Sequence, residues 1–260
     1  MPMIPSDDCR IHAQIEGPER APVLMLCNSL GTDLRMWDDQ VEALTRHFRL
    51  LRYDRRGHGQ SEAPKGPYNM EMLSRDALAV MDAMGVEKVN WCGLSMGGMV
   101  GMWLGANAPE RINRLVLSNT AAYMADKQIW DGRFKTVREG GMAAVADGTM
   151  ERWFTKGFRE RAPQAVARLK QMVLDTPVEG YIGCGEAVRD MDHREIIRRI
   201  TAPTMIIAGR HDPGTTVEAA EFLRGRIPGS KLVVLEAAHI SNVEQAQAYT
   251  DALLGFFGVK

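Results

Sequence analysis

A serine flanked by two glycines offers the clearest chemistry in this sequence. Residues 93–97 read Gly-Leu-Ser-Met-Gly, after a short and mostly apolar run at 89–92 and before a helical pattern that begins at Met96. In a strand–turn–helix arrangement, the glycines permit a sharp turn, the Ser95 hydroxyl points out of the sheet, and the first N–H groups of the helix face the same point. The pattern predicts a nucleophile beside anion-binding donors. The alternative is a glycine-rich turn with an idle serine.

A serine hydroxyl is a poor nucleophile at neutral pH, so it needs a base, and that base needs an orienting acid. Asp212 and His239 each follow an apolar run, 204–208 and 231–235 respectively, and both come after Ser95. Serine, acid, histidine is the chain order that this turn motif requires. The sequence therefore predicts a catalytic triad of Ser95, Asp212 and His239.

The other five histidines are weaker candidates for the base. Three of them precede the serine, which conflicts with the required order; they are His12, His47 and His58, and the last lies in a Gly-x-Gly turn, where we expect a structural role. His193 lies in a helical segment, and we expect His211 to cap the loop beside Asp212. The segment 118–120, Ser-Asn-Thr, ends another apolar run but holds no carboxylate, which favours Asp212 as the acid.

An acyl-transfer site also needs two preorganised N–H donors for the developing oxyanion. The N–H of Met96, directly after the nucleophile, is the first candidate. The second should come from the loop 28–32, Asn-Ser-Leu-Gly-Thr, and Leu30 is our candidate there. The alternative is that this loop is simply a turn.

Strand and helix patterns alternate around these residues. The expected strands are 9–16, 23–27, 48–53, 89–92, 112–117, 204–208 and 231–235, and the expected helices are near 36–44, 70–84, 96–108, 216–226 and 242–257. This alternation predicts an α/β fold with a mostly parallel central sheet and helices on both faces. In such a sheet, ligands bind at the carboxyl ends of the strands, so we expect the catalytic residues there.

The strand signal disappears between residues 125 and 200. This segment shows helical spacing, with breaks expected at 140–141, 147–148, 163 and 177. We therefore expect a core of residues 1–124 and 201–260, with residues 125–200 inserted as a helical cap over the strand ends.

Composition narrows the class of protein. Of the 260 residues, 45% are hydrophobic and 25% charged, and the net charge is −1, so we expect neither a nucleic-acid partner nor a membrane surface. No apolar run approaches a membrane-spanning length, and the first residues lack the pattern of a signal peptide. The four cysteines are scattered, which favours reduced thiols in a cytoplasmic protein; they are Cys9, Cys27, Cys92 and Cys184.

The motifs Gly-Leu-Ser-Met-Gly-Gly at 93–98 and Tyr-Asp-Arg-Arg-Gly-His-Gly-Gln-Ser at 53–61, with the region of His239, resemble the α/β-hydrolase superfamily along essentially the whole chain. The loop 27–32, Cys-Asn-Ser-Leu-Gly-Thr, departs from the His-Gly usual in that superfamily. Together with 130–134, 137–142 and 152–155, this loop is similar to the 3-oxoadipate enol-lactonases of aromatic-compound degradation.

The resemblance implies hydrolysis of 3-oxoadipate enol-lactone to 3-oxoadipate by Ser95, Asp212 and His239, with no metal or organic cofactor. The substrate carries a carboxylate, so a cation in the pocket is expected. Trp130, Arg133, Phe134 and Val137 share one helical face, where Arg133 could bind that carboxylate, pair with an acid of the cap or reach solvent. Trp130 and Trp153 could line the pocket or simply pack.

Other functions stay open at this point. The rivals are a carboxylesterase, a carbon–carbon bond hydrolase or a perhydrolase of the same fold, and a receptor that keeps the triad without turnover. A haloalkane dehalogenase is disfavoured, because its chemistry wants a carboxylate in place of Ser95. The expected partner is a small lactone or ester, and the oligomeric state is left open.

Overall fold

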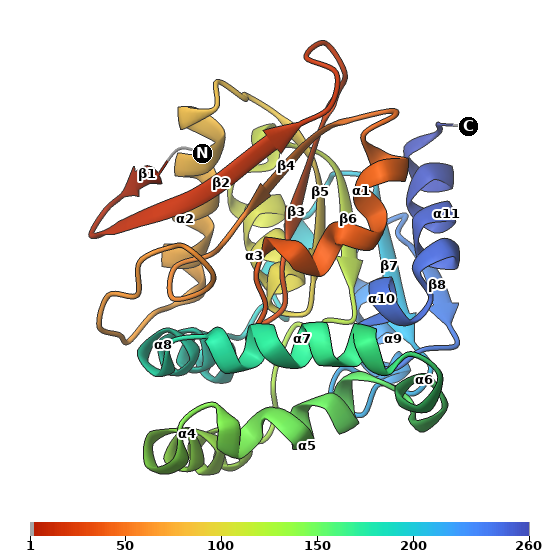
Figure 1. The fold of residues 1–260 in the computed structure, drawn as a ribbon. Coiled ribbons are helices and arrows are strands. Elements are labelled where there is room, and N and C mark those ends of the chain that lie inside the picture. Colours follow the sequence, from red (N-terminus) through yellow and green to blue (C-terminus); the bar gives the residue numbers. More distant parts are fainter. Residues whose placement is uncertain (1–2, 260) are drawn as a thin grey trace.

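The computed structural model describes residues 3–259, which form one eight-stranded sheet with helices around it (Figure 1). The strands are β1 Met3–Ser6, β2 Cys9–Glu16, β3 Val23–Cys27, β4 Arg49–Tyr53, β5 Val89–Leu94, β6 Ile112–Ser118, β7 Thr204–Gly209 and β8 Lys231–Leu235. Their spatial order is β1-β2-β4-β3-β5-β6-β7-β8. The pairs β1–β2 and β2–β4 are antiparallel and all others parallel, which confirms the predicted mostly parallel sheet.

The register of the sheet aligns the carboxyl ends of five parallel strands. Cys27 pairs with Gly93, and Leu94 with Ser118. Farther along, Gly209 pairs with Leu235. The loops that follow these strands therefore start at one edge of the sheet, as the doubly wound topology requires.

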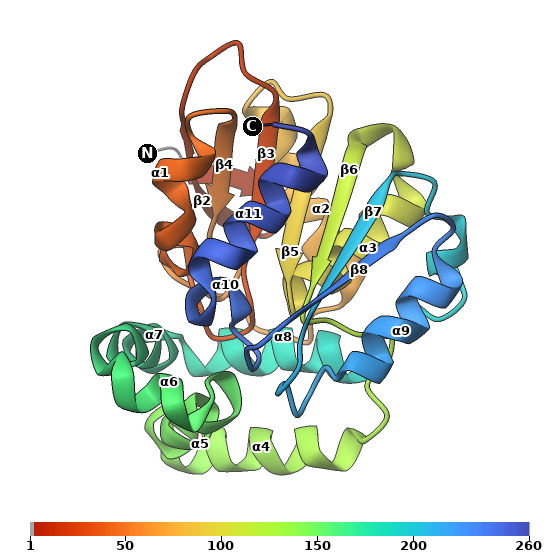
Figure 2. The same ribbon diagram turned by 90° about the vertical axis from the view of Figure 1, so that its right-hand side faces the viewer.

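Helices cover both faces of the sheet, and Figure 2 shows α1 and α11 on one side with α3 and α9 on the other. Around the sheet lie α1 Asp38–Leu44, α2 Met70–Ala83, α3 Met96–Asn107, α9 Val217–Arg226, α10 Ser241–Glu244 and α11 Ala246–Phe257. Helix α3 is apolar on all sides, with ten buried residues, because it packs against α2 as well as against β5 and β6.

Five further helices lie together below the carboxyl ends of the strands, in green in Figure 1. They are α4 Lys127–Gly140, α5 Ala143–Trp153, α6 Lys156–Arg161, α7 Pro163–Asp175 and α8 Val178–Asp190. The division into a core and a cap of residues 125–200 stays a prediction, and its residues 1, 2 and 260 lie outside the described ones. Within residues 3–259, no helix combines the length and apolar content needed to cross a bilayer.

Two local expectations were wrong, and one strand was missed. Strand β1 was missed, because four residues with a proline give no periodic signal. The expected break at 147–148 is absent: α5 runs through Gly148, and the packing of Ala146, Thr149 and Met150 offsets the roughly 1 kcal/mol that glycine costs in a helix. The last helix is divided at Gln245, whose φ of −127° and ψ of 51° lie outside the helical region.

Candidate active site

The turn at Ser95 has the geometry that exposes a nucleophile. Ser95 has φ 59° and ψ −118°, a conformation that side-chain-bearing residues rarely adopt. A Cβ at Gly93 would lie 2.0 Å from the Gly97 carbonyl oxygen, and one at Gly97 would lie 2.1 Å from the Cys27 carbonyl oxygen. Both glycines are therefore required by close backbone approach, as the motif predicts.

His239 and Asp212 form a buried pair beside this turn. The distance from His239 Nδ1 to Asp212 Oδ2 is 2.7 Å. The Asp212 side chain is 1% exposed and that of His239 is 12% exposed. Since Nδ1 faces the carboxylate, Nε2 is left as the atom that can accept a proton.

Four further hydrogen bonds converge on the Asp212 carboxylate. Its Oδ1 accepts from the N–H groups of Gly214 and Thr215, at 2.9 and 3.0 Å. Its Oδ2 accepts from the Thr215 hydroxyl at 2.6 Å and from the Asn119 amide at 3.2 Å. Burial raises the pKa of Asp212, but the attraction and hydrogen bond of His239, with the bonds from Thr215, outweigh it and lower that pKa to about 2. Asp212 is thus a carboxylate at neutral pH.

Ser95, Asp212 and His239 all line one cavity of about 420 Å³ below the sheet edge, here called the central cavity. No hydrogen bond joins Ser95 and His239 among those of residues 3–259; such bonds often tighten only when substrate binds. Of the six histidines, all within the described residues, only His239 lines the central cavity. His12 instead pairs with Asp54, and His211 lies at the surface near Glu236.

The two candidate oxyanion donors lie where helix α3 meets the loop after β3. Leu30 lines the central cavity, whereas Met96 is fully buried and does not line it. Within the described part of the chain, neither backbone N–H donates to a protein acceptor in the turns and loops. The loop is fixed to the helix, because Gly97 N–H donates to the Asn28 carbonyl at 3.1 Å. Their role as oxyanion donors stays a prediction.

His58 holds the other end of this loop. Its Nε2 accepts from Gly31 N–H at 2.9 Å, which requires an unprotonated Nε2. Burial, with the positive charge of Arg55, lowers the pKa of His58 to about 3, so the ring is neutral at working pH. The structural role expected for His58 is thus consistent with its contacts.

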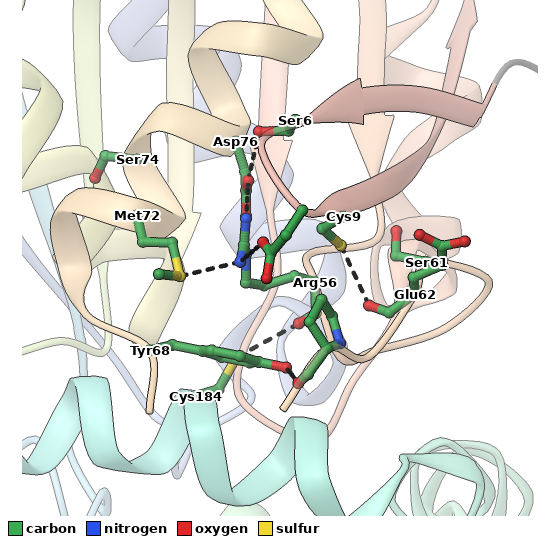
Figure 3. Close-up of polar contacts among 12 residues, drawn as sticks. Ser6, Cys9, Arg56, Ser61, Glu62, Tyr68, Met72, Ser74, Asp76 and Cys184 are labelled. Atoms are coloured by element: carbon green, nitrogen blue, oxygen red, sulfur yellow. Dashed lines mark hydrogen bonds and ion pairs between the residues drawn. The ribbon is translucent and has the colours of Figure 1, made fainter. Parts of the chain in front are cut away.

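A buried ion pair anchors the loop that carries His58 (Figure 3). Arg56 donates from Nε and Nη2 to Asp76 of α2 at 2.6 and 2.7 Å, and Ser6 donates to the same carboxylate at 2.6 Å. Cys184 of α8 donates to the Arg56 carbonyl at 3.5 Å. These contacts join β1, α2 and α8 around one loop.

The helices below the sheet supply the opposite wall of the central cavity. The predicted residues Trp130, Arg133 and Trp153 all line it. The Arg133 guanidinium lies over the Trp130 ring, 4.9 Å from its centroid. Ion pairs in this segment involve other residues, such as Arg138, Arg168 and Arg189, and within residues 3–259 none includes Arg133. Arg133 thus faces the cavity without a carboxylate partner.

Sequence reasoning missed a second arginine in this wall, Arg152. It lines the central cavity, and its Nη2 donates to the Thr149 hydroxyl at 3.1 Å. Burial lowers the pKa of Arg152, and the positive charge of Arg133 lowers it further. Two guanidiniums of like charge therefore share one apolar-walled cavity. No spacing pattern in the sequence distinguished it from the other arginines of residues 125–200.

Thr215 and Asn119 were also missed. Thr215 follows Asp212 by three residues, in the Asp-Pro-Gly-Thr turn that such side-chain bonding favours. Asn119 was noted only for lacking a carboxylate, but its amide bonds Asp212 and the Ala238 carbonyl, the latter at 3.1 Å. Both residues hold the Asp212 carboxylate in place by hydrogen bonds.

Known proteins resemble this chain over nearly its whole length. The family model described as alpha/beta hydrolase fold matches residues 22–246. The chain is 41% identical to 3-oxoadipate enol-lactonase 2 of Acinetobacter baylyi, over 95% of this chain and 93% of the relative. It is 37% identical to 3-oxoadipate enol-lactonase 1 of that organism, over 95% and 92%. The crystal structure of the enol-lactonase from Burkholderia xenovorans LB400 superposes with a TM-score of 0.96 at 43% identity, covering 97% of this chain and 98% of that one.

These findings confirm the predicted fold and the predicted resemblance, and with them the prediction of an enzyme of the hydrolase class. The similarity covers the nucleophile turn, the helices below the sheet and the loop of His239 alike. The chain belongs to the α/β-hydrolase fold family, and within it to the group that contains the 3-oxoadipate enol-lactonases of Acinetobacter baylyi.

Proposed function

We propose that this chain hydrolyses 3-oxoadipate enol-lactone to 3-oxoadipate through an acyl-enzyme on Ser95. The observation that carries the proposal is the shared cavity, in which Ser95 and His239 face Arg133 and Arg152. A nucleophile and a cationic wall in one cavity suit an ester that bears a separate carboxylate. The names of the two relatives at 41% and 37% identity support this choice of substrate.

In the acylation step, Ser95 Oγ attacks the lactone carbonyl carbon while His239 Nε2 takes the hydroxyl proton. Asp212 stabilises the resulting imidazolium. The N–H groups of Leu30 and Met96 bind the oxyanion of the tetrahedral intermediate. The ring C–O bond then breaks, and the enolate oxygen takes the proton from His239. The resulting enol tautomerises to the ketone, while the acyl group stays on Ser95.

In the deacylation step, His239 removes a proton from a water molecule, which attacks the ester carbonyl of the acyl-enzyme. The second tetrahedral intermediate collapses, and Ser95 leaves with the proton from His239. The product gains a second carboxylate, so a monoanion enters the cavity and a dianion leaves it.

The cap residues select the anionic substrate in this proposal. Arg133 can bind a carboxylate with two parallel N–H···O bonds, and the Trp130 ring beneath it fixes the guanidinium plane. Trp153 supplies apolar contact for the lactone ring. We also propose that the protein binds a small-molecule ester or lactone as its partner. We propose a cytoplasmic location for it.

Steady-state hydrolysis of the enol-lactone tests the proposal, with loss of its ultraviolet absorbance as the readout. We expect wild-type protein to turn the lactone over with a higher kcat/KM than a neutral ester or a vinylogous diketone. The Ser95→Ala variant should run at the background rate.

The rival functions give different results in the same assays. Faster turnover of neutral esters would indicate a carboxylesterase, and cleavage of the diketone a carbon–carbon bond hydrolase. Peroxide-dependent halide oxidation would indicate a perhydrolase. Stoichiometric acylation of Ser95 without turnover would indicate a receptor. Any of these, with lactone loss at background, overturns the proposed substrate.

A further inference from the structure

A buried glutamate joins the helices below the sheet to the loop of His239. Glu244, in α10, is 5% exposed and lies outside the central cavity. Its carboxylate accepts the Ala238 N–H at 2.9 Å. It also accepts the hydroxyl of Thr155 and, at 3.3 Å, the N–H of the same residue. One carboxylate thus holds Ala238, the residue before His239, and Thr155, the N-cap of α6.

A second bond joins the same two segments on the other side of the histidine. Ile240 N–H donates to the Trp153 carbonyl at 3.1 Å. The N–H groups on both sides of His239 are therefore held by contacts that lead to residues 153–155. Residues 153–155 form the α5–α6 junction, which begins with the last residue of α5, Trp153, whose side chain lines the central cavity.

We propose that Glu244 is a positioning residue that couples the placement of the α5–α6 junction to the placement of the His239 ring. The proposal rests on the proposed function in one respect, since it takes His239 as the base for Ser95. Removal of the carboxylate frees the Ala238 N–H and the Thr155 hydroxyl together. Residues 238–240 and residues 153–155 then lose the carboxylate that binds both segments.

Catalytic geometry is sensitive to such a loss, because a displacement of about 1 Å can cost roughly 100-fold in rate. Glu244 accepts backbone N–H groups of Ala238 and Thr155 in a buried site, where an N–H left without an acceptor is unfavourable. A backbone position that separates the Ala238 N–H from Glu244 is therefore disfavoured, and residues 238–240 keep one position as long as Glu244 is present.

The test measures the rate at which a small fluorophosphonate labels Ser95, since this rate reports the Ser95–His239 pair without requiring the natural substrate. We expect Glu244→Ala to slow labelling about 10- to 100-fold. Glu244→Gln should stay within about threefold of wild type, because its amide can donate to the Thr155 oxygen while its carbonyl accepts from Ala238.

Substitutions of Thr155 test the same coupling from the other partner of the Glu244 hydrogen bond. Thr155→Val should slow labelling, Thr155→Ser should not, and adding Thr155→Val to Glu244→Ala should cost nothing more, because both remove the same bond. Thr155 also caps α6 through the Phe158 N–H. Asn69→Ala, which removes the N-cap of the distant α2, controls for loss of a cap and should label at the wild-type rate.

Melting curves show which variants are folded, and the two Thr155 variants keep the test valid if Glu244→Ala fails to fold. Labelling of Thr155→Val at the wild-type rate would overturn the coupling, and so would slow labelling by Glu244→Gln equal to that of Glu244→Ala. Normal labelling without lactone turnover rejects only the proposed substrate. If wild-type protein is not labelled at Ser95, both proposals fall.

Discussion

Ser95 is held in an unfavourable backbone conformation by bonds on both sides. Its φ of 59° is in the region that costs non-glycine residues about 1–3 kcal/mol. Ser95 N–H donates to the Ser118 carbonyl at 2.8 Å, and the Thr120 hydroxyl donates to the Ser95 carbonyl at 2.8 Å. These bonds tie the turn to the end of β6, so the hydroxyl is oriented before any substrate arrives.

Substitution of Asp212 tests whether this residue orients the His239 ring. With a pKa of about 2, its carboxylate is ionised throughout the neutral range. In Asp212→Asn, the amide can favour the wrong tautomer of His239, so we expect kcat to fall on the order of 10⁴-fold with little change in KM. Steady-state kinetics at pH 7 measure both. A loss below about 10-fold would show that Asp212 is not the orienting acid.

At the scale of elements, glycines at two positions have opposite consequences. Gly97 packs against the β3–loop junction, where a Cβ would lie 2.1 Å from the Cys27 carbonyl oxygen and 3.0 Å from that of Asn28. Gly132 lies inside α4 with nothing within 4 Å of its Cβ position. Replacing each glycine by alanine therefore distinguishes the effect of a steric clash with the backbone, at Gly97, from the effect of helix propensity, at Gly132.

We expect Gly97→Ala to destabilise the protein by more than about 2 kcal/mol or to displace the loop 28–32 and abolish activity, since two backbone segments would have to move apart. Gly132→Ala should instead stabilise the protein by about 0.5–1 kcal/mol. Urea unfolding of both variants measures these changes. Equal effects of the two substitutions would contradict the argument from close approach.

Helices and strands could be predicted from the sequence where apolar runs were continuous and where glycines marked a tight turn. The strands β3, β5 and β7 and the turn at Ser95 follow from such patterns. Strand β1 and the division between α10 and α11 could not be predicted in this way. Both depend on contacts that leave no periodic pattern: β1 pairs with β2 across a short turn, and the α10 turn brings Glu244 to the Ala238 N–H.

At the site, too, some residues follow from sequence patterns and others only from the fold. Chain order and strand ends predicted which serine, acid and histidine line the central cavity together. Arg152 could not be selected among the many arginines of residues 125–200, because its neighbour Arg133 comes from another helix. Spatial convergence of two helices leaves no spacing signal in one sequence.

At the scale of the whole molecule, buried neutral histidines make the fold sensitive to acid. Burial lowers the pKa of His193 to about 4, against about 6.5 in the unfolded chain. The unfolded state therefore binds more protons between these values, and stability is lost as pH falls from about 6.5 toward 4. His58, with a pKa of about 3, adds to the loss over a wider range in the same direction.

Replacement of His193 should reduce this sensitivity. We expect the free energy of unfolding of wild type to drop by about 3 kcal/mol more than that of His193→Gln between pH 7 and pH 4. Urea titrations at both pH values measure the drop. The same drop in both proteins would mean that His193 is not held neutral by the fold.

The central claim is that one cavity joins the Ser95 nucleophile to a cationic wall, and the most direct test is the preference for an anionic lactone. The measurement is kcat/KM for the enol-lactone relative to an uncharged lactone of the same ring, in wild type and in Arg133→Gln, Arg152→Gln and the double variant. We expect wild type to favour the anionic lactone by about 100-fold or more, and the double variant to lose that preference while keeping its rate on the uncharged lactone. Equal kcat/KM for the two lactones in wild type, or a preference that survives in the double variant, would contradict the account.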